Sequence, residues 1–87
     1  MTEIREHRLK RMAMRSMRRG IKEMDIILVR YANARLEQMS EAELDAYDAL
    51  LNENDQDLYQ WVSGQQEPPA HVSVQIADIR ALIDAGE

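Results

Sequence analysis

A single glycine interrupts the first 63 residues of this 87-residue chain, and it stands between two stretches that favour helix. The residues before Gly20 are rich in arginine, and those after it begin a strongly apolar run. Glycine has no side chain, so it tolerates a positive φ and lets another surface approach the backbone closely. We therefore expect two helices that meet at a corner at Gly20.

Hydrophobic periodicity predicts helices and shows no sustained β alternation. The expected helical ranges are 3–18, 21–36, 41–53, 55–62 and 73–85. Ser40 and Glu43 have the spacing of a capping box, and Asp55 and Ser73 are expected to cap the last two helices. Connections this short favour neighbours that pack antiparallel. The sequence predicts an all-α fold, a compact five-helix bundle, with residues 1–87 forming one domain.

The second predicted helix is the best candidate for the centre of the bundle. Met24, Leu28 and Tyr31 fall on one face of that helix at helical spacing. The first helix has a thinner apolar stripe, which includes Leu9 and Met12. We therefore expect the first helix to be only partly packed.

Charge is divided unevenly along the chain. Residues 1–35 hold ten bases and four acids, a net charge of +6, and residues 36–87 hold one base and twelve acids, a net charge of −11. Such polarity can steer and orient a charged partner. Equally, the two halves can neutralise one another inside one bundle. The sequence leaves both readings open.

Few residue patterns here could support catalysis or metal binding. The chain has no cysteine, so it has neither a disulfide framework nor a thiolate metal site. The two histidines, His7 and His71, lie on different predicted elements, and the serines have cap or surface explanations. The three glycines are too far apart for a phosphate-binding loop. We therefore expect neither an enzyme nor a metal protein.

The arginine-rich first helix raises an alternative, a nucleic-acid-binding or antitoxin-like module. Clustered arginines suit phosphate contacts. Against this stand a pI near 5.0 and the absence of any aromatic residue before Tyr31. The longest aliphatic run, residues 26–29, is far too short to span a bilayer. We expect no nucleic-acid partner and no membrane insertion.

Two stretches carry a family resemblance. Residues 19–25, Arg-Gly-Ile-Lys-Glu-Met-Asp, resemble the RGxxE signature of the succinate dehydrogenase assembly factor family (SdhE type). Residues 51–61 resemble that family's second stretch, an acidic loop that leads into a short helix ending in Trp. The resemblance implies a chaperone-like factor that binds the apo flavoprotein subunit of succinate dehydrogenase, or of fumarate reductase. The factor would promote covalent attachment of FAD to that subunit.

The resemblance also implies a site. The residues it places at or near the partner are Arg15, Arg19, Gly20, Glu23 and Asp25. Tyr59 and Trp61 match the second stretch and are expected to support the site by packing. FAD would belong to the partner, with no cofactor bound stably by this chain. We expect a monomer, located in the cytoplasm, or in the mitochondrial matrix if the source is eukaryotic.

Overall fold

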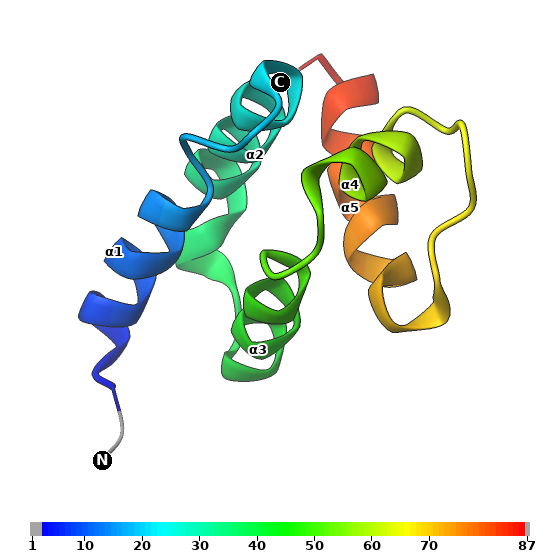
Figure 1. The fold of residues 1–87 in the computed structure, drawn as a ribbon. Helices are drawn as coiled ribbons and strands as arrows, with labels where there is room; N and C mark the ends of the chain where they lie inside the picture. The colour runs from blue at the N-terminus through cyan, green and yellow to red at the C-terminus, as the bar shows by residue number, and fades with distance from the viewer. Residues whose placement is uncertain (1–2, 87) are drawn as a thin grey trace.

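The computed structural model describes residues 3–86, and within them the chain is helical, without strands. The elements are α1 (Arg5–Arg15), α2 (Lys22–Arg35), the 3₁₀ turn η1 (Leu36–Gln38), α3 (Glu41–Leu50), α4 (Asp55–Val62), the 3₁₀ turn η2 (Ala70–Val72) and α5 (Ser73–Asp84). α1 and α2 lie side by side, and α4 packs against α5 (Figure 1). This confirms the predicted five-helix, all-α architecture. No helix in residues 3–86 has the length and apolar character needed to cross a membrane.

The core is built mainly by α2 to α5. Its helical members include Met24, Leu28, Tyr31, Leu44, Tyr47, Leu50, Leu58, Trp61, Val62, Ile76, Ile79 and Leu82, all buried. α1 contributes one fully buried apolar side chain, Met12, while Leu9 and Ala13 pack at the margin. Each buried aliphatic side chain stabilises the fold by about 1.5–3 kcal/mol. α2 is therefore central, and α1 is only partly packed, as its thin stripe predicts.

The structure shows which residues cap α3 and α4, and these can be compared with the predicted caps. The capping box at α3 is confirmed: the Ser40 N–H donates to Glu43 Oε1 at 2.8 Å, and the Glu43 N–H donates to Ser40 Oγ at 3.2 Å. At α4 the prediction is wrong by one residue. Asn54 is the cap, and its Oδ1 accepts from the N–H of Gln56 at 2.8 Å. Asp55 is the first helical residue, and its carboxylate accepts hydrogen bonds from Arg19 and Gly20 instead of capping the helix.

Other predicted helix boundaries also differ from those in the structure. Ser73 is not the cap of α5 but its first residue, since η2 leads directly into the helix, and its hydroxyl donates to the carbonyl of Ala70 at 3.1 Å. α1 ends at Arg15 rather than near residue 18: the Met17 N–H donates to the Met14 carbonyl, three residues back, and Arg18 then adopts a left-handed φ of 58°. α3 ends at Leu50, three residues early, where the chain turns toward α4.

Candidate functional site

The corner, defined here as residues 18–25, joins α1 to α2. Its left-handed residue is Arg18, with φ of 58°, and not Gly20. The prediction that glycine serves a positive φ at position 20 is therefore wrong. A left-handed conformation costs a non-glycine residue about 1 kcal/mol. The N–H of Arg18 donates to Asp25 Oδ1 at 2.7 Å, so Asp25 stabilises the turn from within.

Gly20 is nevertheless constrained, by space and not by its φ. Its N–H donates to Asp55 Oδ2 at 2.6 Å. A Cβ built on Gly20 would lie 3.0 Å from that same oxygen, which is closer than ordinary van der Waals contact. Apart from this contact Gly20 is exposed, so the chain at this position faces solvent and is not sealed in the interior.

Arg19 points into the loop between α3 and α4. Its Nε donates to Asp55 Oδ1 at 2.7 Å, and only 11% of its side chain is exposed. Its Nη atoms donate to the carbonyls of Arg15 at 3.1 Å, Leu51 at 3.1 Å and Glu53 at 3.3 Å. Hydrogen bonds from a charged donor are about twice as strong as neutral ones. Arg19 therefore ties the corner to the loop that precedes α4.

Asp55 is the site residue that the sequence reasoning missed. One carboxylate accepts from both Arg19 and Gly20, and so joins the two stretches that carry the family resemblance. From the sequence, Asp55 is expected to cap a helix and falls within the second stretch of the family resemblance, with no partner predicted for its carboxylate. One feature of the sequence could have indicated another role for Asp55. Asn54, one position earlier, is an equally good cap residue, so Asp55 is not needed as the cap.

The remaining predicted partner-binding residues divide between inward and outward positions. Arg15 faces α3, donating to Asp48 Oδ1 at 2.7 Å and to Asn52 Oδ1 at 2.6 Å. Glu23 is exposed in the first turn of α2, and its side chain takes part in none of the side-chain hydrogen bonds or ion pairs found in residues 3–86. The corner thus presents Gly20 and Glu23 to solvent, whereas Arg15, the last residue of α1, is turned toward α3. That these residues bind a partner stays a prediction.

Tyr59 and Trp61 lie on α4, the helix whose first residue is Asp55. Trp61 is buried in the core, and Tyr59 is partly buried and packs against it. Trp61 is therefore held in the core, while part of the Tyr59 side chain remains at the surface. Their predicted role in supporting the site is compatible with this placement.

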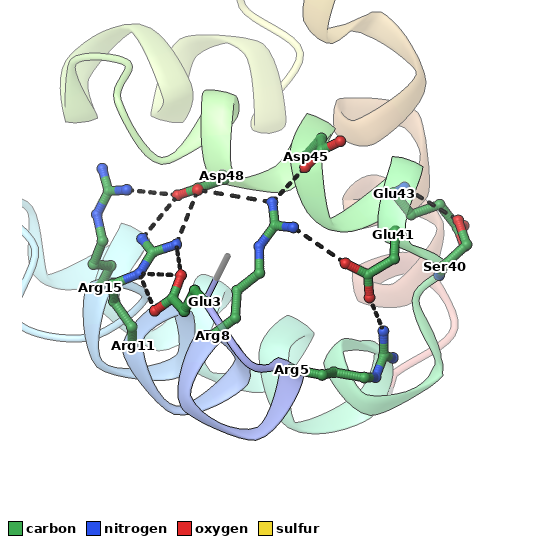
Figure 2. Close-up of polar contacts among 10 residues, drawn as sticks. All are labelled: Glu3, Arg5, Arg8, Arg11, Arg15, Ser40, Glu41, Glu43, Asp45 and Asp48. Atoms are coloured by element: carbon green, nitrogen blue, oxygen red, sulfur yellow. Dashed lines mark hydrogen bonds and ion pairs between the residues drawn. The ribbon is translucent and has the colours of Figure 1, made fainter. Parts of the chain in front are cut away.

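A row of arginines along α1 faces α3 (Figure 2). We call the residues Arg5, Arg8, Arg11 and Arg15 the arginine ladder. Their carboxylate partners on α3 are Glu41, Asp45 and Asp48. The two oppositely charged halves of the chain therefore neutralise one another in part, through the contacts between α1 and α3. The arrangement does not favour the nucleic-acid alternative, because ladder arginines already bind carboxylates.

Asp48 is the hub of this network. It accepts from Arg11 at 3.2 and 3.1 Å and from Arg15 at 2.7 Å, and Arg8 lies 3.9 Å away. The hydrogen bond from Arg11 is the main cause that holds the pKa of Asp48 below its usual range. Hydrogen bonds to Glu3 and Asp48 in turn raise the pKa of Arg11. Each partner thus favours the charged form of the other.

Ser16 provides a second tie between α1 and α3. From the sequence, Ser16 is expected to be a cap or a surface residue. This prediction is wrong, because Ser16 is fully buried. Its hydroxyl lies 2.9 Å from the carbonyl of Met12 and 2.6 Å from the hydroxyl of Tyr47. Burial is the main cause that raises the pKa of Tyr47 to about 12. Periodicity of apolar residues cannot find a buried serine.

The largest pocket described lies between α2, α3 and α5, away from the corner. Its volume is about 650 Å³, and its lining includes Tyr31, Arg35 and Asp78. The hydroxyl of Tyr31 donates to Asp78 Oδ2 at 2.6 Å. Within residues 3–86 no cluster of three or more His, Cys, Asp or Glu residues could hold a metal ion. The pocket lining contains no glycine to form a phosphate-binding loop of the kind that holds dinucleotides.

Comparison with known proteins points to the same family as the two stretches described above. The family described as flavinator of succinate dehydrogenase matches residues 10–83. The chain is 43% identical over 61 residues to the mitochondrial succinate dehydrogenase assembly factor 2 of Meyerozyma guilliermondii, covering 70% of this chain and 45% of that protein. It is 35% identical over 63 residues to the FAD assembly factor SdhE of Legionella pneumophila, covering 72% and 80%. The chain spans less than half the length of the first fungal relatives that it matches.

Proposed function

The chain belongs to the family of succinate dehydrogenase flavinators, and we propose that it is an assembly factor that binds the flavoprotein subunit of that enzyme and promotes attachment of FAD. The observation that carries the proposal is the extent of the family match. It covers residues 10–83, which include the corner, the loop before α4 and α4 itself.

The geometry supports a binding role. Arg19 and Asp55 hold the corner in one conformation, so little ordering remains to be done when a partner binds. Gly20 leaves bare backbone beside the exposed carboxylate of Glu23. A partner can therefore approach the chain closely at Gly20 and meet a negative charge three residues away.

In the proposed role this chain contributes binding and orientation and no reacting group. FAD, and the side chain of the partner that receives it, belong to the flavoprotein subunit, where FAD supplies the electrophilic ring system. The chain would stabilise the subunit in the arrangement in which those two groups meet. Holding reactants in a favourable geometry accelerates a reaction without a nucleophile from the helper.

Finer features of the role are also proposals. The related flavoprotein of fumarate reductase is a second candidate partner, and we propose that the chain acts as a monomer that binds one subunit. Relatives come from yeast mitochondria and from a bacterium. We place this chain where the flavoprotein subunit is assembled, in the bacterial cytoplasm or in the mitochondrial matrix.

The test is complementation in a bacterial strain that lacks its own assembly factor. Covalent flavin is read as fluorescence of the succinate dehydrogenase flavoprotein subunit in a denaturing gel. We expect the wild-type chain to restore fluorescence, and Glu23→Ala to restore much less. Glu37→Ala is the matched control, because Glu37 is an exposed acid in η1, just beyond the end of α2 that is far from the corner. Full fluorescence with Glu23→Ala would remove the corner from the proposal, and no restoration by the wild type would overturn the function.

A further inference from the structure

We propose that Asp55 is the positioning residue of the corner, and that position 20 must be glycine to leave room for the Asp55 carboxylate. This deepens the proposed function and rests on it where partner binding is concerned. It changes the roles of the signature residues. Arg19 and Gly20 would shape the corner from within, and Glu23 would be the signature side chain left to touch the partner.

The two carboxylate oxygens of Asp55 join it to the corner. Each of its two oxygens has one short hydrogen bond, Oδ1 with Arg19 Nε at 2.7 Å and Oδ2 with Gly20 N at 2.6 Å. Asp55 itself is held at the start of α4 by the Asn54 cap, and only 19% of its side chain is exposed. The carboxylate therefore fixes the Gly20 backbone relative to α4, across 35 residues of sequence.

Gly20 is restricted by the space around it. With no positive φ at Gly20, backbone conformation does not exclude alanine there. What opposes alanine is the 3.0 Å approach of its Cβ to Asp55 Oδ2. A carboxylate at the end of a free side chain could move aside, but this one is held by Arg19. Relief of the contact would therefore weaken the bonds that define the corner.

Most of the hydrogen-bond donors of Arg19 are already used within the chain. A guanidinium has five N–H donors, and four hydrogen bonds already run from Arg19 to Asp55 and to three backbone carbonyls. Little capacity remains for a two-point grip on a carboxylate of a partner. The side chain of Glu23, by contrast, is exposed and makes no hydrogen bond or ion pair with another side chain or with the backbone of the described residues. A carboxylate there suits a basic side chain or a free N–H on the partner.

The steric claim is tested on the isolated chain with a double-mutant cycle of Gly20→Ala and Asp55→Ala. We expect Gly20→Ala to lower Tm by about 4 °C or more in the wild-type background. In the Asp55→Ala background it should change Tm by less than about 1 °C, because the opposing oxygen is gone. Equal losses in both backgrounds would show that glycine is not there for Asp55, and would overturn the proposal.

The positioning claim is tested by the affinity for purified apo flavoprotein subunit, measured well below every Tm. We expect Asp55→Ala to raise Kd about tenfold or more, through loss of two hydrogen bonds at a charged group. Ile79→Val, a destabilising core change in α5, should leave Kd unchanged, as should Asp57→Ala, an exposed acid in the same helical turn as Asp55. Wild-type Kd for Asp55→Ala, or an equal rise for Ile79→Val, would overturn the positioning role.

The role of Glu23 has its own measurement, which separates binding from stability. We expect Glu23→Gln to raise Kd about tenfold with Tm unchanged, and Glu37→Gln to change neither. Unchanged Kd for Glu23→Gln would contradict its contact with the partner. If the wild-type chain bound no flavoprotein at all, the proposed function would fail, while the stability cycle at Gly20 and Asp55 would still decide the steric claim.

Discussion

Asp48→Asn should destabilise the fold by removing the hub of the arginine ladder. The change is nearly isosteric and alters helix propensity little, so its effect reports the lost charge. Asp48 faces Arg11 and Arg15 directly, with Arg8 close by. Without the negative charge these guanidinium groups would face an amide that can accept fewer hydrogen bonds.

The magnitude follows from the exposure of the network. The Asp48 side chain is 26% exposed, so solvent screens its ion pairs in part, and each is worth roughly 0.5–1 kcal/mol. Two direct partners give a loss of about 1–2 kcal/mol in the free energy of unfolding. In a domain of this size that corresponds to a fall in Tm of about 5–15 °C.

The assay is thermal unfolding followed by circular dichroism, at low salt and in 1 M NaCl. Asp45→Asn is the matched control, because Asp45 lies on the same helix, pairs with Arg8 alone among residues 3–86, and has a side chain that is 71% exposed. We expect its effect to be less than about 0.5 kcal/mol. High salt should reduce the loss from Asp48→Asn, because the Debye length falls to about 3 Å. A loss no larger than that of Asp45→Asn would refute the assignment of Asp48 as the hub.

Three further outcomes follow from named contacts. Ser16→Ala should lower the free energy of unfolding by about 1–3 kcal/mol in urea titration, because the buried Tyr47 hydroxyl loses a partner, whereas exposed Ser63→Ala should have little effect. Asn54→Ala should cost about 1 kcal/mol and speed hydrogen exchange in the first turn of α4; unchanged exchange would contradict the cap. The pKa of Asp48 is lower in the folded state, so its ionised carboxylate stabilises the fold at pH values above the unfolded pKa near 3.9, and this stabilisation is lost as pH falls through the folded pKa. We therefore expect Tm to be flat from about pH 7 to 5 and to fall below about pH 4. The fall should be less steep in Asp48→Asn, and an equally steep fall would contradict this role of Asp48.

Helices with a strong apolar face could be predicted from the sequence alone. The spacing of Met24, Leu28 and Tyr31 specifies both the existence of α2 and its buried face, and the capping box at Ser40 specifies the start of α3. These features depend on residues three or four positions apart, which local sequence records directly. The thin stripe of α1 likewise predicts its partial packing.

Contacts between distant residues could not be predicted in this way. Asp55 meets Gly20 across 35 residues, and the sequence offers a complete local explanation of Asp55 as a cap, which proves to be wrong. The left-handed conformation of Arg18 depends on the Asp25 carboxylate, so a search for glycine in that role selects the wrong residue. Charge asymmetry reveals that the two halves could pair, but not which acid faces each arginine.

The central claim is tested most directly with purified components. Apo flavoprotein subunit of succinate dehydrogenase and FAD are mixed with or without this chain, and the rate of covalent flavin attachment is followed by fluorescence of the denatured subunit. We expect the wild-type chain to raise the rate severalfold, and Gly20→Arg to abolish the increase although it remains folded by circular dichroism. A rate that is the same with and without the wild-type chain would contradict the proposed function.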